Sequence, residues 1–272
     1  KTIVAFLAML QAIEARSQAA LMAPTEVLAR QHFATIDPLA RAIGLNIAIL
    51  TGRDKGKARK AVLEGLKLGD INMVVGTHAL FQEEVAFADL GLAVVDEQHR
   101  FGVHQRLMLA SKGAAADMLV MTATPIPRTL MLCAYSDLDS SRLTDKPAGR
   151  QPIDTRALPL SRIEDVVTRL EGALATGARV FWVCPLVDES EMSDLAAATD
   201  RHAALDARFP GQTGLIHGQM SGTAKDKAMA AFSAGDTRIL VATTVIEVGV
   251  DVAEATIMVI EHAERFGLAQ LH

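Results

Sequence analysis

Short apolar runs alternate with longer segments of helical periodicity along the whole chain. In the first half, runs rich in Ala, Val, Leu, Ile and Met predict β-strands at residues 19–23, 46–50, 71–75, 92–95 and 118–121. The segments between them carry apolar residues at helical spacing, which predicts helices over residues 3–13, 26–36, 57–68 and 128–135. Because strands alternate with helices, we expect an α/β fold with a mostly parallel sheet.

A polar stretch at residues 144–152 interrupts this alternation. Pro147, Gly149 and Pro152 punctuate it and no long periodic pattern continues through it, so we expect a linker there. The alternation then restarts, with predicted strands at residues 155–158, 180–184, 214–216, 239–242 and 257–260 and predicted helices at 163–175, 195–209 and 223–234. The pattern therefore predicts two α/β domains, which we bound at residues 1–146 and 147–272.

The composition favours cores built from aliphatic side chains and methionine, because 50% of the 272 residues are hydrophobic but only 4% are aromatic. No apolar run reaches the ~18 residues that span a bilayer and no secretory signal pattern opens the chain, so we expect a soluble intracellular protein. Cys133 and Cys184 lie far apart in apolar surroundings, which is typical of reduced structural thiols. The histidines show no convincing ligand spacing, and we expect no zinc site.

The net charge of -5 argues against a protein that coats nucleic acid through bulk electrostatics. Any contact with nucleic acid must therefore be local. The densest basic cluster consists of Lys55, Lys57, Arg59 and Lys60. It fits either a solvated helix face or such a local contact.

Two adjacent carboxylates, Asp96 and Glu97, end the apolar run at residues 92–95. Such a run is typical of a buried parallel strand, and open α/β sheets bind ligands at the carboxyl ends of their strands. In nucleoside triphosphate hydrolases, an acid in this place holds Mg²⁺ and another polar group orients the attacking water. The alternative is a strand that ends in a solvated acidic turn.

Turns that carry a hydroxyl or a glycine follow the other predicted strands of the first half. These turns are Pro24-Thr25-Glu26, Thr51-Gly52, Gly76-Thr77-His78 and Thr122-Ala123-Thr124-Pro125. In a parallel sheet they fall on one edge, where hydroxyls, backbone N–H groups and helix amino termini can contact phosphate oxygens. Each turn alone is more typical of an ordinary helix cap or turn, where Ser and Thr form local hydrogen bonds. Their recurrence favours a phosphate-contacting rim.

Lys1 and Thr2 stand directly before a helical pattern, as do the last two residues of a G-x-x-x-x-G-K-[ST] phosphate loop. With the acid pair downstream, we expect a nucleotide site whose glycine-rich part has been cut away before residue 1. In the second half, the hydroxyls of Thr243 and Thr244 follow a predicted strand and suit a sugar-phosphate contact. Further along, Gly249 and Asp251 allow close backbone approach and a polar hold on a ribose or a basic partner, with a capped helix turn as the alternative.

Taken in order, these motifs resemble those of superfamily 2 helicases. Within that superfamily, residues 96–103, 124–129 and 263–272 resemble the RecG family of bacterial ATP-dependent DNA helicases, which remodel stalled forks and branched junctions. The related translocases of transcription-coupled repair usually carry Glu where this chain has Gln98. The resemblance covers essentially the entire chain. It implies two RecA-like domains, each a mostly parallel sheet flanked by helices.

The resemblance also implies a role for each matching residue. In the nucleotide site, Lys1 would contact the β/γ phosphates, Thr2 and Asp96 would hold Mg²⁺, and Glu97 would polarise the hydrolytic water. Gln98 and His99 would link this site to Thr122 and Thr124. Gly249 and Asp251 would face the nucleotide. The residues that would contact the backbone of one DNA strand are Thr25, Thr51, Gly52, Thr77, Thr243 and Thr244. The implied cofactors are ATP and Mg²⁺. The implied partners are branched or forked DNA and a single-stranded-DNA-binding protein, for a monomer in the nucleoid of the bacterial cytoplasm.

The expected activity is translocation driven by alternating closure of the two domains around ATP. The arginine motif that contacts the γ-phosphate in this family would follow residue 272. Because an arginine finger is worth ~10³ to 10⁵ in rate, we expect the chain as given to hydrolyse ATP weakly or not at all. The alternatives are a transcription-repair translocase and a non-catalytic, nucleotide-dependent DNA-binding module.

Overall fold

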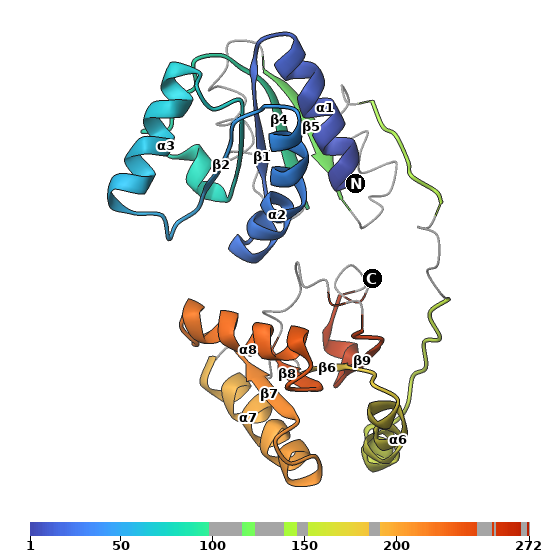
Figure 1. The fold of residues 1–272 in the computed structure, drawn as a ribbon. Coiled ribbons are helices and arrows are strands. Elements are labelled where there is room, and N and C mark those ends of the chain that lie inside the picture. The colour runs from blue at the N-terminus through green and yellow to red at the C-terminus, as the bar shows by residue number, and fades with distance from the viewer. Residues whose placement is uncertain are drawn as a thin grey trace. The chain divides into compact units, whose positions relative to one another are not determined.

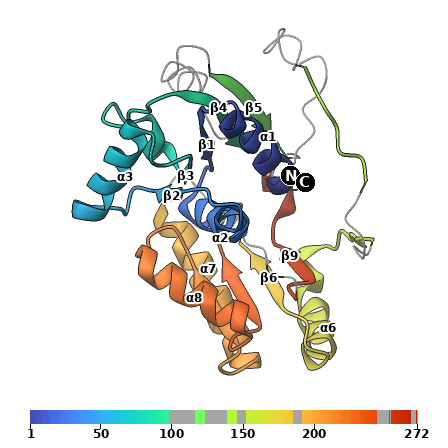
Figure 2. The same ribbon diagram turned by 45° about the horizontal axis from the view of Figure 1, so that its top comes forward.

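Two compact units make up the chain in the computed structural model, which describes residues 1–97, 116–122, 139–145, 152–184, 191–243, 252, 254–267 and 271 (Figures 1 and 2). The first unit contains Lys1–Ala123, and the second contains Thr124–Glu247 and Asp251–His272. Because residues 123–138 and 146–151 lie outside the described residues, the domain bounds at 146 and 147 stay predictions. Each unit is an α/β layer structure with its own parallel sheet.

The first unit alternates helices with strands, as the apolar periodicity predicts. Its elements are α1 (Thr2–Glu14), β1 (Gln18–Met22), α2 (Glu26–Ala42), β2 (Ile47–Leu50), α3 (Gly56–Leu68), β3 (Met73–Gly76), the 3₁₀ turn η1 (His78–Phe81), β4 (Leu90–Asp96) and β5 (Asp117–Met121). The strands pair in the order β2-β3-β1-β4-β5, and every pairing is parallel. All carboxyl ends of these strands therefore meet at one edge of the sheet.

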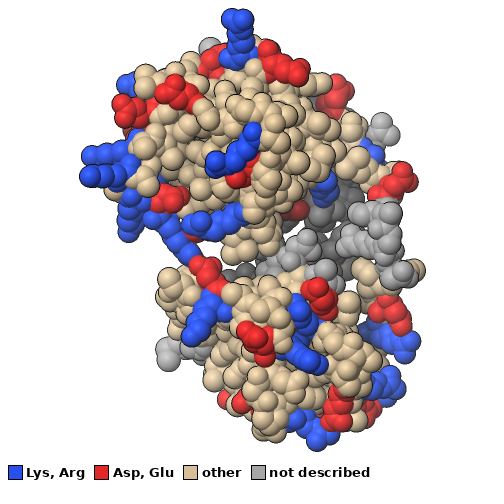
Figure 3. Space-filling model, in the orientation of Figure 1, with Lys and Arg blue, Asp and Glu red and all other residues tan. Residues whose placement is uncertain are grey.

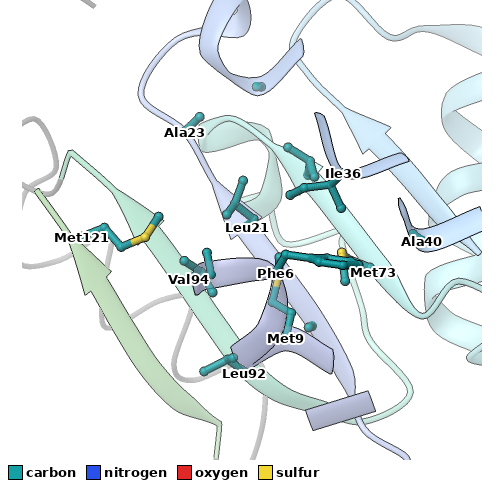
Figure 4. Packing of buried hydrophobic residues seen from close by; sticks show 14 residues of the cluster. Phe6, Met9, Leu21, Ala23, Ile36, Ala40, Met73, Leu92, Val94 and Met121 are labelled. Carbon is teal, nitrogen blue, oxygen red and sulfur yellow. The ribbon is translucent and has the colours of Figure 1, made fainter. Parts of the chain in front are cut away.

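Two apolar layers cover the faces of this sheet, because successive side chains of a strand point to opposite faces. Leu21 of β1 points into the layer formed by α1 and α2, where Phe6, Met9 and Ile36 pack (Figure 4). Residues one position along, such as Met22 and Val95, belong to the opposite layer with α3 and η1. Both layers consist of aliphatic residues and methionine apart from an occasional Phe, in agreement with the low aromatic content.

The second unit is a smaller sheet built on the same plan. Its elements are η3 (Leu160–Arg162), α6 (Ile163–Ala175), β6 (Val180–Val183), α7 (Glu191–Arg208), β7 (Thr213–Ile216), α8 (Gly222–Ala234), β8 (Ile239–Ala242), β9 (Ile257–Ile260) and η5 (Ala263–Arg265). The strands pair in parallel in the order β7-β8-β6-β9. Helices α6 and α7 supply the core on one face, and Phe232 of α8 packs against Phe181 on the other, with ring centroids 4.8 Å apart.

Trp182, Arg201 and Glu261 join three elements of the second unit through one carboxylate. The indole N–H of Trp182 in β6 and the Nε–H of Arg201 in α7 both donate to Oε1 of Glu261, each over 2.5 Å. The guanidinium also lies 5.4 Å from the Trp182 ring centroid. The cluster therefore fixes α7 to the carboxyl end of β9 over the central strand.

One predicted strand is wrong. Residues 155–158 are not part of any strand, and the whole stretch 152–160 is exposed, with Ile153 at 77%. The extended conformation that Pro152 and Pro159 favour is present, but no described strand lies beside it, so its backbone groups face solvent. The predicted helix at residues 128–135 lies outside the described residues. Within the described part of the chain, no helix is long and apolar enough to cross a membrane.

Candidate functional site

The turns singled out in the first half lie at one edge of the first sheet, as predicted. Thr25 follows β1, Thr51 follows β2, Thr77 follows β3 and Thr122 follows β5, while Asp96 is the last residue of β4. This gathering follows from the parallel pairing alone, because every strand runs in the same direction. It places carboxylates, hydroxyls and the amino terminus of α2 at the edge where open α/β sheets bind ligands.

Asp96 is buried at this edge and is bonded to a histidine that the sequence analysis did not single out. Oδ2 of Asp96 lies 2.8 Å from Nε2 of His32 in α2, and only 7% of each residue is exposed. On the other side of the imidazole, Nδ1 of His32 lies 3.2 Å from the hydroxyl of Thr2. The two predicted Mg²⁺ ligands, Thr2 and Asp96, are therefore connected through His32. The described residues form no hydrogen bond to the second carboxylate oxygen of Asp96, Oδ1.

Glu97 leaves the strand with its backbone in the left-handed region, at φ +49°. That conformation is unusual for a residue with a side chain and costs of order 1 kcal/mol or more, so the surrounding structure must impose it. The hydroxyl of Thr122, at the end of the neighbouring strand β5, donates to Oε2 of Glu97 over 3.4 Å. The chain therefore turns away from the direction of β4 at Glu97. The Glu97 carboxylate is hydrogen-bonded to Thr122, the residue predicted to couple the site to DNA.

The other threonines of the rim differ in how their hydroxyls are used. Thr25 caps α2 by accepting from the N–H of Leu28, which is the helix-cap interpretation of this residue. Thr51 is fully buried, and its hydroxyl donates to Asp54 over 2.8 Å. Thr77 is 4% exposed, and its hydroxyl is buried without a hydrogen-bond partner in the described part of the chain. Because buried polar atoms are normally satisfied, Thr77 is the rim hydroxyl with unused bonding capacity.

Basic side chains lie at the amino end of α1 and over α3. Lys1 is exposed at the amino end of α1, where its carbonyl accepts the first helical hydrogen bond. Lys and Arg side chains gather over α3 in Figure 3. Within the basic cluster defined above, the three lysines are exposed, whereas Arg59 bonds to Glu84 and Gln82. The lysine face therefore remains free for solvent or for a local phosphate contact.

In the second unit, the corresponding edge carries Thr243 after β8 and His217 after β7. Thr243 is 3% exposed. The pKa of His217 is lowered by desolvation and by the nearby ammonium of Lys225, and its Nδ1 has no hydrogen-bond partner among the described residues. The remaining predicted site residues, Gln98, His99, Thr124, Thr244, Gly249 and Asp251, lie outside the described residues.

The arrangement suits a magnesium-triphosphate ligand. Thr2 and Asp96 offer hard oxygen donors, and Mg²⁺ in nucleotide sites commonly takes only one or two protein ligands besides phosphates and waters. The amino terminus of α1, with Lys1, can receive phosphate oxygens. Glu97 adds a carboxylate within reach of the same edge. The residues present therefore fit the nucleotide chemistry that the sequence predicts.

Comparisons with known proteins match this chain to helicases. The DEAD/DEAH box helicase family matches residues 1–132, and the helicase conserved C-terminal domain matches residues 162–272. The ATP-dependent DNA helicase RecG of Acidithiobacillus ferridurans is 51% identical over 273 residues, and that of Escherichia coli K12 is 49% identical over 278. Both alignments cover the whole of this chain, which spans 40% of the length of each relative.

Solved structures show the same two-unit fold. A structure of RecG bound to a three-way DNA junction is 41% identical, with a TM-score of 0.78, and the match covers 99% of this chain and 35% of that one. Saccharomyces cerevisiae Dbp5 bound to RNA and ADP BeF3 has a TM-score of 0.67 at 16% identity, over 94% of this chain and 66% of that one. The second likeness concerns the fold alone.

Proposed function

The chain belongs to the RecG family, and from this premise we propose that it is the ATP-driven motor core of a double-stranded-DNA translocase. The whole protein would remodel branched DNA, such as stalled forks and Holliday junctions, in recombination and repair. The observation that carries the proposal is the pair of carboxylates at the end of β4, one bonded through His32 to Thr2 and the other bonded to Thr122. We further propose that it works as a monomer in the nucleoid, with a single-stranded-DNA-binding protein as a second partner.

Each group at the first sheet edge has a chemical task in this proposal. Lys1 and the amino terminus of α1 would bind the β/γ phosphates, and Thr2 and Asp96 would hold Mg²⁺. An ion held there would supply positive charge to offset the negative charge that develops during phosphoryl transfer. Glu97 would orient the attacking water and accept its proton. Because Thr122 donates to Glu97, a change in the position of this carboxylate reaches the end of β5 directly.

The DNA contacts would be made by backbone groups and hydroxyls, which are neutral. Phosphate contacts of this kind position a protein on DNA without reading its sequence, and they tolerate the net charge of -5. In the first unit the candidates are Thr25, Thr51, Gly52 and Thr77. In the second they are Thr243 and Thr244, with Gly249 and Asp251 facing the nucleotide. Gln98, His99 and Thr124 would complete the link between the two sites.

Glu97→Gln in the full-length protein tests the proposal. We expect DNA-stimulated ATP hydrolysis to fall by about 100-fold or more, because the amide cannot accept the proton, while binding of a non-hydrolysable ATP analogue is retained. Glu83→Gln is the matched control, since Glu83 is an exposed residue of the same unit and the change in charge is identical. A Glu97→Gln protein with undiminished hydrolysis would contradict the proposal and would favour a passive DNA-binding module.

A further inference from the structure

His32 has no chemical task in the function proposed above, yet among the described residues it is hydrogen-bonded to both Thr2 and Asp96. It lies on the buried side of α2, two turns after the N-cap residue Thr25. Because a carboxylate can only accept a hydrogen bond, Nε2 of His32 must carry the proton shared with Asp96. In the tautomer with its proton on Nε2, the ring has a lone pair on Nδ1 that can accept from the hydroxyl of Thr2.

We propose that His32 is a positioning residue for the metal-binding carboxylate of Asp96. This inference rests on the proposed nucleotide site. The bond from Nε2 fixes Oδ2 over 2.8 Å and leaves Oδ1, which no described residue bonds, as the oxygen offered to the ion. The bond from Thr2 fixes the rotation of the imidazole ring, so that the donor of His32 stays directed at Asp96.

A neighbouring donor of this kind has a definite physical effect. Carboxylates that bind metal ions are usually held by a hydrogen bond from a further residue, and loss of that bond typically costs 10- to 100-fold in metal affinity or activity. Asp96 is also buried, so an unheld carboxylate would lack a hydrogen bond that water could not easily replace. A histidine that merely fills space beside the core would not act on one particular oxygen of Asp96.

Variants at position 32 separate these two possibilities. In glutamine, the side-chain amide can occupy the place of Nε2 and donate to Asp96, but the hydrogen bond with the Thr2 hydroxyl is lost. In asparagine, the amide occupies the place of Nδ1 and can bond Thr2, but it does not reach Asp96. The measurement is the binding of Mn²⁺ to the full-length protein in the presence of the non-hydrolysable analogue AMP-PNP, followed by electron paramagnetic resonance without turnover. Thermal unfolding of each variant serves as the folding control.

We expect His32→Ala and His32→Asn to weaken Mn²⁺ binding by about 10- to 100-fold, and His32→Gln to restore most of the affinity. The inference is overturned if the folded alanine or asparagine variant binds Mn²⁺ as tightly as the unmodified protein, or if glutamine is no better than asparagine. Failure of the unmodified protein to bind Mn²⁺ with AMP-PNP would instead overturn the proposed nucleotide site, and Asp96→Asn provides the reference for that loss.

Discussion

Arg201 should contribute more to the stability of the second unit than any ordinary surface arginine. Its guanidinium donates to both carboxylate oxygens of Glu261, over 2.5 Å to Oε1 and 3.2 Å to Oε2, and lies over the ring of Trp182. The side chains of Arg201 and Glu261 are only 22% and 11% exposed. Arg201→Met removes the charge and the donors but keeps an unbranched apolar stem against α7.

The expected loss can be worked from these contacts. Removing one partner of a buried ion pair costs about 3 to 5 kcal/mol, because the other charge is left without compensation. Water reaches about a fifth of the Arg201 side chain, and Glu261 retains the indole N–H of Trp182 as a donor. Both facts reduce the loss, so we expect Arg201→Met to lower the free energy of unfolding by about 2 to 3 kcal/mol.

Trp182 provides the assay, because it is the only tryptophan in the sequence. Its fluorescence during urea unfolding reports the second unit without a signal from the first. With a urea dependence of about 2 kcal/mol per molar, the midpoint should fall by about 1 to 1.5 M. The comparison is made between midpoints, since loss of the guanidinium changes the fluorescence of the folded state itself.

Arg208→Met is the matched control on the same helix. Arg208 pairs with Glu171, but the two side chains are 56% and 45% exposed. Exposed pairs of this kind contribute about 0 to 1 kcal/mol. If Arg201→Met shifts the midpoint no further than Arg208→Met, the carboxylate cluster does not stabilise the unit and the reasoning from burial is refuted.

Two more predictions follow from close packing and from burial. A Cβ at Gly76 would overlap the Leu50 carbonyl oxygen, so Gly76→Ala should lower the melting temperature. A Cβ at Gly52 would meet nothing within 4 Å, so Gly52→Asp should leave the melting temperature unchanged. Gly52→Asp should, however, weaken DNA binding in a filter assay. Burial raises the pKa of Cys184 to about 12 from 9.0, so in a Cys133→Ser background alkylation at pH 8 should be roughly 10³-fold slower in the folded than in the urea-unfolded protein. The stability that this shift reflects is present below pH 9 and is lost as the pH rises toward 12. Equal melting temperatures in the first case, or equal alkylation rates in the second, would contradict these predictions.

Strand positions could be predicted from the sequence because buried parallel strands are continuous apolar runs. The predicted and observed strands differ by two residues or fewer at each end, except at residues 155–158. That stretch has the local character of a strand but no partner, and pairing is a property that only the folded chain possesses. Helix α2 was predicted to end at residue 36, but it continues to Ala42 through Pro38. Its packing through Ala40 outweighs the hydrogen bond that the proline lacks.

The candidate site was predictable to the extent that the topology determines it. Strand ends of a parallel sheet must meet at one edge, so a motif after each strand is sufficient to predict which turns come together. His32 escaped this reasoning because it lies inside a helix and follows no strand. Its position on the buried face of α2 between other buried residues, Ala29 and Ile36, made an ordinary core histidine equally plausible from sequence. Only the distances to Thr2 and Asp96 distinguish the two interpretations.

If the proposed function holds, the geometry would link the nucleotide site to the predicted DNA-contacting turns without a long pathway. Helix α2 is capped by Thr25 at the rim and carries His32 two turns later, so a single rigid helix connects a predicted DNA-contacting turn with the carboxylate of Asp96. The bond from Thr122 to Glu97 makes a second connection, through the paired ends of β4 and β5. In each connection, an acid at the end of β4 accepts one hydrogen bond. Because a helix and a paired strand are both stiff, each connection joins an acid to a rim residue through one hydrogen bond and one rigid element.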